Sequence, residues 1–146
     1  FFRKHSPATE IWLVDEYGSL ALPGNPGPAD RYLNGMGTSI APANYDPPTF
    51  AQFVDHVVYV QAAEAIQAAV AVARSEGLLI GGTGGAVLHV LRDIAASRYA
   101  AGDTIVGVLP DHGSRYSDTQ FNKEWLSVRG IDVPELFSDH ASEISP

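Results

Sequence analysis

Short apolar runs alternate with longer amphipathic stretches along this chain. An uninterrupted apolar run of this length is typical of a strand that is buried on both faces of a sheet. We expect four such strands, at residues 11–15, 56–60, 78–80 and 104–109. Strands that alternate with helices predict a parallel sheet covered by helices. The expected fold class is therefore α/β, with a three-layer αβα arrangement.

Two helices are predicted between these strands. Residues 62–76 carry an alanine-rich face that favours close packing, and Gly77 is a typical helix end. A second helix is expected from Ala86 until Gly102 stops it. Its apolar positions recur with the helical period and should face the core: Val87, Val90, Leu91 and Ile94.

The ends of the chain suggest its domain organisation. Phe1–Lys4 resembles the last turn of a helix, because basic residues are followed by a proline at position 7. We therefore expect a fragment whose preceding element is missing. Shorter helices are expected at 48–54 and 118–128. The pattern dissolves after Gly130, so residues 1–130 are assigned to one partial domain and residues 131–146 to a C-terminal tail.

Composition narrows the class of protein. The 146 residues are 45% apolar, which is enough for one packed domain. A net charge of −8 argues against a nucleic-acid partner, and no apolar run is long enough for a membrane span. The sequence contains no cysteine, which excludes disulfides and thiol chemistry. A cytoplasmic location is the default expectation.

The glycine-rich segment 81–85 allows three interpretations. It lacks the Lys-Ser/Thr of a P-loop, because Val87 and Leu88 follow the glycines, and its spacing does not match G-x-G-x-x-G. A tight turn with close helix packing is favoured over direct phosphate contact, and a wall of a neighbouring site stays open. The five histidines show no metal-ligand spacing, so no metal site is predicted.

Two further segments are candidates for ligand contact. Gly35, Met36 and Gly37 lie in a long loop, where glycines would let the backbone approach a flat ligand. Asp111, His112 and Gly113 follow a predicted strand, and parallel sheets bind ligands at the carboxyl ends of their strands. From the residues alone, each segment could instead serve only its own turn.

Three ordered motifs resemble the C-terminal half of the cysteine synthase and cystathionine β-synthase family. EGLLIGGTGGA at 76–86 matches E-G-[IL]-L-x-G-x-[ST]-[SG]-G-A, and LPDHGSRY at 109–116 matches [LV]-P-[DS]-x-G-x-R-Y. GMGTSIAP at 35–42 is similar to the G-[IM]-G-x-x-x-x-P active-site loop of that family. The NKEWL ending is closest to the diaminopropionate-synthase and O-phosphoserine-using branch.

The resemblance implies a partial large domain of a fold type II enzyme that uses pyridoxal 5'-phosphate. It places Gly35, Met36 and Gly37 beside the cofactor, with Asp111 and Gly113 flanking His112. His112 occupies the position where the family usually has a serine that bonds the pyridine nitrogen. The lysine that holds the cofactor belongs to an upstream motif, so no catalytic residue is assigned within this chain.

The implied reaction replaces the β-substituent of an activated serine, such as O-acetyl- or O-phosphoserine, by a sulfur or nitrogen nucleophile. The implied partners are the amino-acid substrate, the N-terminal part of the same enzyme and a second copy of the complete protein. This chain alone is expected to be inactive. The alternative from another class is a non-catalytic α/β module that binds a ligand or a partner at the same sheet edge.

Overall fold

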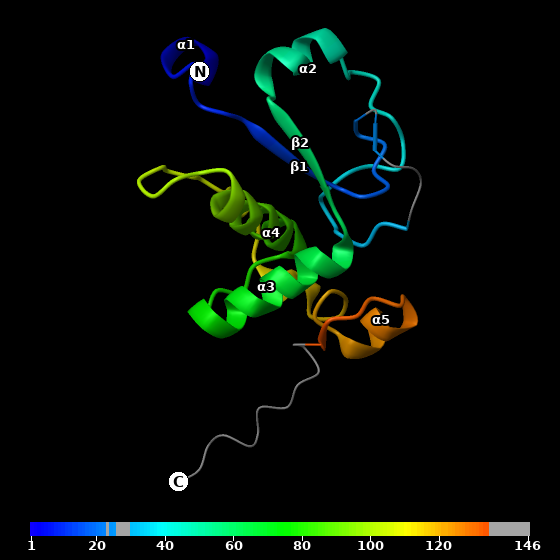
Figure 1. Ribbon diagram of the computed structural model, residues 1–146. Coiled ribbons are helices and arrows are strands. Elements are labelled where there is room, and N and C mark those ends of the chain that lie inside the picture. Colours follow the sequence, from blue (N-terminus) through cyan, green and yellow to red (C-terminus); the bar gives the residue numbers. More distant parts are fainter. Residues whose placement is uncertain (23, 26–29, 135–146) are drawn as a thin grey trace.

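The computed structural model describes residues 1–22, 24–25 and 30–134 (Figure 1). Its elements follow one another in the order α1 (Phe2–His5), β1 (Trp12–Glu16), α2 (Pro47–Phe53), β2 (His56–Val60), α3 (Ala62–Glu76), α4 (Gly82–Ser97), the 3-10 turn η1 (Gly113–Tyr116) and α5 (Lys123–Val128). The α/β class is confirmed, since helices and parallel strands share this chain.

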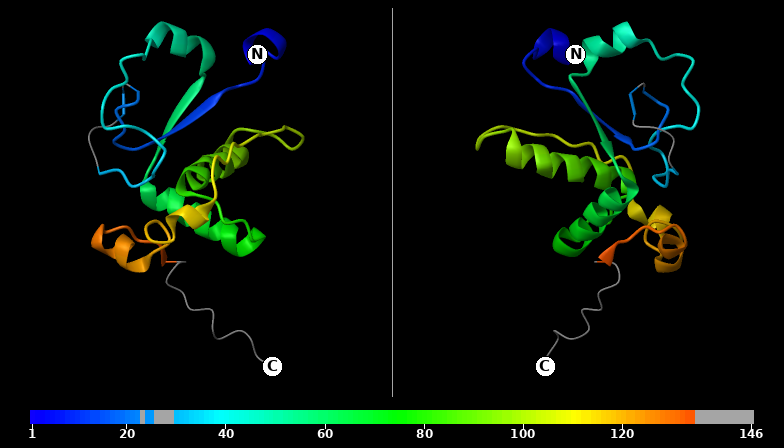
Figure 2. Two further views of the ribbon diagram at one scale, coloured as in Figure 1. Left: turned by 180° about the vertical axis from the view of Figure 1, so that it is seen from behind. Right: turned by 45° about the vertical axis from the view of Figure 1, so that its right-hand side comes forward.

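The sheet of the described residues consists of β1 and β2, which pair in parallel from Trp12 opposite His56 to Glu16 opposite Val60. Both strands were predicted, and β1 begins and ends one residue later than the expected range 11–15. The crossing helices α3 and α4 lie beside the carboxyl end of β2 in both views of Figure 2. The pairing of β1 with β2 confirms the parallel direction that was predicted for the sheet.

Helix α3 has the predicted bounds, and its start is fixed by a reciprocal cap. The Gln61 side chain accepts a backbone hydrogen bond of the first turn, and the Glu64 carboxylate accepts from the Gln61 amide at 2.9 Å. Helix α4 differs from the prediction at both ends. It begins at Gly82, four residues earlier than Ala86, and ends at Ser97 rather than near Gly102.

The early start of α4 follows from how closely it packs on α3. A Cβ atom on Gly85 would lie 2.0 Å from the Ala65 carbonyl oxygen and 3.0 Å from the Ala69 Cβ. Only glycine permits this approach, so tertiary packing overrides the low helix propensity of the glycine-rich segment. These glycines form the first turn of the helix instead of a loop before it.

The predicted strands at 78–80 and 104–109 are wrong for this structure. Ile80 makes one isolated antiparallel bridge with His112, and residues 104–109 form neither helix nor strand. The side chains of Val106 and Val108 are 82% and 73% exposed. A strand is defined by its pairing, and in the described part of the chain no neighbouring strand meets this apolar run.

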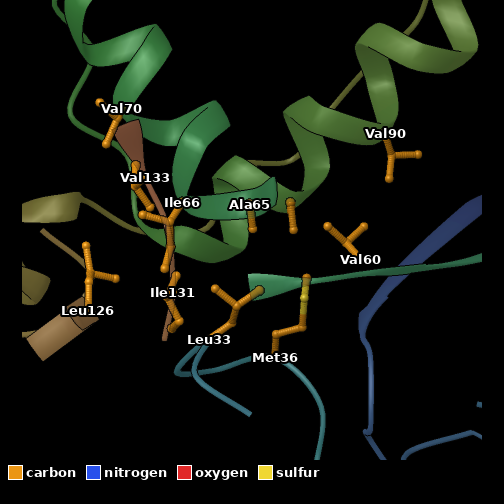
Figure 3. Close-up of a cluster of buried hydrophobic side chains, with 11 residues drawn as sticks. Leu33, Met36, Val60, Ala65, Ile66, Val70, Val90, Leu126, Ile131 and Val133 are labelled. Carbon is orange, nitrogen blue, oxygen red and sulfur yellow. The ribbon is translucent and has the colours of Figure 1, made fainter. Parts of the chain in front are cut away.

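One hydrophobic cluster joins the described elements (Figure 3). Leu33 and Met36 approach it from the loop after β1, and Leu126 approaches it from α5. Its buried members are Leu33, Met36, Val60, Ala65, Ile66, Val70, Ala86, Val90, Leu126, Ile131 and Val133. The packing thus reaches Val133, beyond the proposed division at residue 130, whereas residues 135–146 of the proposed tail lie outside the described residues.

The C-terminal helix is shorter than expected. It starts at Lys123 and not at residue 118, because the Asn122 side chain accepts from the Trp125 amide at 2.9 Å and caps it there. Phe121 therefore precedes the helix, although Phe121 and Trp125 both pack against the cluster. Within residues 1–22, 24–25 and 30–134, no helix has the length and apolarity needed to cross a membrane.

The contact between α3 and α4 gives the first prediction. Gly85→Ala should lower the free energy of unfolding by about 1–3 kcal/mol or more, because its methyl group would overlap the α3 backbone. Gly84→Ala is the matched control: its Cβ would meet Ile80 at 3.4 Å, an ordinary contact, and should be neutral or stabilise by up to about 1 kcal/mol. Urea unfolding of both variants measures this, and equal effects would contradict the packing.

Candidate functional site

Both predicted ligand-contact segments bond to the start of α4. The Thr83 hydroxyl donates to the Asn34 carbonyl oxygen at 3.3 Å, directly before Gly35. The Gly81 amide donates to the Asp111 carbonyl oxygen at 3.2 Å, directly before His112. The structure therefore attaches residues 35–37, the Gly-Met-Gly loop, and residues 111–113, the Asp-His-Gly turn, to one short stretch of chain.

The Gly-Met-Gly loop depends on its two glycines. Gly35 and Gly37 have φ angles of +87° and +69°, in the left-handed region that disfavours other residues. A Cβ on Gly37 would also lie 2.6 Å from the Ser19 hydroxyl oxygen, whereas a Cβ on Gly35 would come no closer than 4.0 Å to Thr83. The loop thus packs tightly at Gly37 and stays open at Gly35.

Met36 belongs to the buried cluster and also lines a cavity of about 790 Å³ between β1, α4 and the segment 103–110. Thr83, Val87 and Leu91 of α4 line the same cavity. Val87, Leu91 and Ile94 are half-buried and line the cavity, while Val90 is buried in the core as predicted. The cavity wall does not include His112 or Asp111.

The Asp-His-Gly turn is rigidly built at its first and last residues. One carboxylate oxygen of Asp111 accepts a short hydrogen bond from the Tyr116 hydroxyl, and the other is buried and has no hydrogen-bond partner among the described residues. That bond to the carboxylate raises the pKa of Tyr116 above 10.0. A Cβ on Gly113 would lie 2.6 Å from the Ile80 carbonyl oxygen, so this position has no room for a side chain.

His112 itself is exposed, and its neighbours define its tautomer. The Ser114 amide donates to His112 Nδ1 at 3.2 Å, and the Ser114 hydroxyl lies 2.9 Å from the same nitrogen. Because a backbone N–H can only donate, Nδ1 is the acceptor and the neutral ring carries its proton on Nε2. The imidazole therefore presents a hydrogen-bond donor away from the turn.

The glycine-rich segment serves close packing, the first of its three interpretations. The Gly82 amide donates to Gln120 Oε1 at 2.9 Å, and a Cβ on Gly82 would lie 2.4 Å from that oxygen. A Cβ on Gly81 would overlap Asp111 in the same way. The amides of Gly81 and Gly82 thus bond to the protein itself.

Buried polar side chains that sequence reasoning missed hold the segment before the Gly-Met-Gly loop. Glu16 Oε1 accepts from the Tyr32 amide at 2.6 Å and from the Leu33 amide at 3.0 Å. Gln120 Nε2 donates to the Tyr32 carbonyl oxygen at 3.0 Å. The only sequence signal for Glu16 is a second acid after the apolar run of β1, and Gln120 has none.

Burial raises the pKa of Glu16 above 4.5, although the two amides and the Arg31 guanidinium act in the opposite direction. Its other oxygen, Oε2, lies 3.9 Å from Arg31 Nη1 and accepts no hydrogen bond from the described part of the chain. In the described part of the chain, no group of three acidic or histidine side chains could hold a metal ion. Lys4 and Lys123 are both exposed.

The raised pKa of Glu16 gives a prediction for pH dependence. The folded state holds this proton more tightly than the unfolded state, so its stabilising contribution is complete below pH 4.5 and is lost as the pH rises through the folded pKa. The unfolding free energy of the wild type minus that of Glu16→Gln should therefore fall as the pH is raised. Denaturant titrations at several pH values measure this, and a difference independent of pH would refute it.

One family model and several curated proteins are similar to this chain. The family model described as "Pyridoxal-phosphate dependent enzyme" matches residues 1–111. A putative cysteine synthase of Sinorhizobium fredii is 32% identical over 92% of this chain and 39% of its own length. An N-(2-amino-2-carboxyethyl)-L-glutamate synthase of Ralstonia nicotianae is 33% identical over 86% of this chain and 35% of its own length. An O-acetylserine dependent cystathionine beta-synthase of Bacillus subtilis is 31% identical over 82% of this chain and 37% of its own length.

Solved structures share the fold. The crystal structure of an O-ureido-L-serine synthase covers 90% of this chain with a TM-score of 0.71 and 20% identity, and the match spans 41% of that protein. An O-acetylserine dependent cystathionine beta-synthase from Helicobacter pylori covers 80% with a TM-score of 0.65 and 24% identity, over 36% of its length. The chain thus spans less than two fifths of the curated relatives it matches. It belongs to the family of pyridoxal-phosphate dependent enzymes, among relatives of the cysteine synthase type.

Proposed function

We propose that this chain forms the C-terminal part of the large domain of an enzyme that replaces the β-substituent of an activated serine. The substrate class is O-acetyl- or O-phosphoserine, and a sulfur or nitrogen compound is the nucleophile. The observation that carries this proposal is the common attachment of the Gly-Met-Gly loop and the Asp-His-Gly turn to the start of α4. The relatives include a putative cysteine synthase and an O-acetylserine dependent enzyme, which supports this class of substrate.

The residues of the two segments fit one side of pyridoxal phosphate. A pyridine nitrogen needs a facing donor, and His112 offers Nε2–H because Nδ1 accepts from the Ser114 amide. A flat ring needs backbone without side chains beside it, which the open side of Gly35 provides. When bound, the cofactor supplies an electron sink for cleavage at the β-carbon. His112 would set how strongly the ring withdraws electrons, and Met36 and the two glycines would orient it.

The lysines of this chain do not fit the role of covalent anchor for the cofactor. A lysine that forms a Schiff base must be desolvated in the site, and the lysines at positions 4 and 123 are exposed. We assign the anchoring lysine and the main phosphate-binding loop to the N-terminal part of the same enzyme. The apolar cavity beside α4 and the exposed Val106 and Val108 are the surfaces that this part would cover. Assembly as a homodimer and a cytoplasmic location belong to this proposal.

The proposal predicts how the chain behaves with its cofactor. The purified chain, mixed with pyridoxal phosphate and freed of the excess, should retain less than about a tenth of an equivalent, because no desolvated amine holds it. The visible absorbance of bound cofactor should appear only when the N-terminal part is supplied. Borohydride trapping of one equivalent on Lys4 or Lys123 would overturn the proposal that this chain is a part without its own anchoring lysine.

The role of His112 gives a separate prediction. In the complete enzyme, His112→Ser should keep the cofactor content within about twofold and change kcat by about tenfold or more, because a hydroxyl and an imidazole polarise the ring nitrogen differently. His89→Ser, which alters a histidine paired with Asp93 on α4, is the matched control and should change neither quantity. Equal kcat values for the wild type and His112→Ser would remove His112 from the site.

A further inference from the structure

The side chain of Arg31 reaches along the Gly-Met-Gly loop and bonds to it at two points. Its Nη1 donates to the Met36 carbonyl oxygen at 3.1 Å, and its Nη2 donates to the Ser39 hydroxyl oxygen at 2.7 Å. The Met36 carbonyl lies between the two left-handed glycines, where the backbone has most freedom. A planar guanidinium with two bonds of this kind removes that freedom more effectively than a single donor.

Glu16 holds this guanidinium from the protein interior. Its Oε2 lies 3.9 Å from Arg31 Nη1, and the two side chains are 2% and 20% exposed. Its Oε1 is occupied by the Tyr32 and Leu33 amides, so the carboxylate cannot turn away without breaking both bonds. No hydrogen bond joins the two side chains at this distance, so Glu16 acts on the guanidinium through its charge, which solvent screens less in the interior than at the surface.

We infer that Arg31 is a positioning residue for the Gly-Met-Gly loop, with Glu16 as the group that fixes its guanidinium. Arg31 does not touch a reacting atom in this role and acts through the peptide that it orients. The opposite side of the loop is fixed by Ser19, whose hydroxyl accepts from the Thr38 amide at 3.1 Å. The inference rests on the proposed function, because it assigns the held loop to the cofactor side of the site.

Hydrogen exchange of the chain tests the positioning without any cofactor. Arg31→Met keeps an unbranched apolar stem and removes both donors, so the amides of residues 35–39 should exchange at least about tenfold faster. Amides in the middle of α3 should keep their rates. Arg92→Met is the matched control, because it removes an exposed guanidinium from α4, and it should leave residues 35–39 unchanged.

Two milder variants make the result specific. Arg31→Lys retains the charge but can place only one ammonium group, so it should restore part of the protection and not all of it. Glu16→Gln keeps an acceptor for the Tyr32 and Leu33 amides and removes the charge that faces Arg31, so it too should give an intermediate rate. Unchanged exchange at residues 35–39 in Arg31→Met, or a uniform rise over the whole chain, would overturn the inference.

The complete enzyme tests whether the loop serves the cofactor. Arg31→Met should weaken retention of pyridoxal phosphate by about tenfold and alter the visible spectrum of what is bound, with partial rescue by Arg31→Lys. Faster exchange with an unaltered spectrum and unaltered retention would overturn the positioning role. A wild-type enzyme that binds no cofactor would instead refute the proposed function, and the exchange data would still decide whether Arg31 holds the loop.

Discussion

The close contact between α3 and α4 is the constraint on which the other features depend. Gly85 places the α4 backbone against the Ala65 carbonyl, and this fixes where α4 begins. The first residues of α4 then meet three separate segments: Thr83 bonds to Asn34, Gly81 bonds to Asp111, and Gly82 bonds to Gln120. A larger residue at position 85 would shift that start, and all three attachments would shift with it. The site is therefore a consequence of helix packing.

Much of the fold could be predicted because its signals are local. Helix α3 has an alanine-rich face and a terminal glycine, and β1 and β2 are apolar runs with clear ends. Residues 104–109 carry an equally clear apolar pattern, yet they form no strand. The pattern reports that a segment is suited to burial, whereas strand formation also requires a neighbouring backbone. The start of α4 was placed too late because glycine propensity says nothing of the Ala65 contact.

The candidate site also contains some residues that could be predicted from the sequence and others that could not. The Gly-Met-Gly loop and the Asp-His-Gly turn have compositions that stand out along the chain, and the structure joins both to α4. Glu16 and Gln120 were missed because a single buried acid or amide has no local signature. Their importance arises from backbone groups far away in sequence: Gln120 bonds to Tyr32 across 88 residues, and Glu16 bonds to Leu33 across 17. Only the folded chain reveals that these two buried side chains bond to the segment just before the Gly-Met-Gly loop.

The apolar segment 104–109 also affects how the chain behaves in a concentrated solution. Val106 and Val108 point outward, and their backbone amides and carbonyls meet no partner strand in the described part of the chain. An extended apolar edge of this kind templates pairing with another polypeptide. Gly107 lies between the two valines and packs against α4, where a Cβ would meet Val87 and Leu91 at 3.0 Å. Aggregation of this chain should therefore rise with concentration and begin at this edge, so that solubility becomes a measure of how completely the edge is covered.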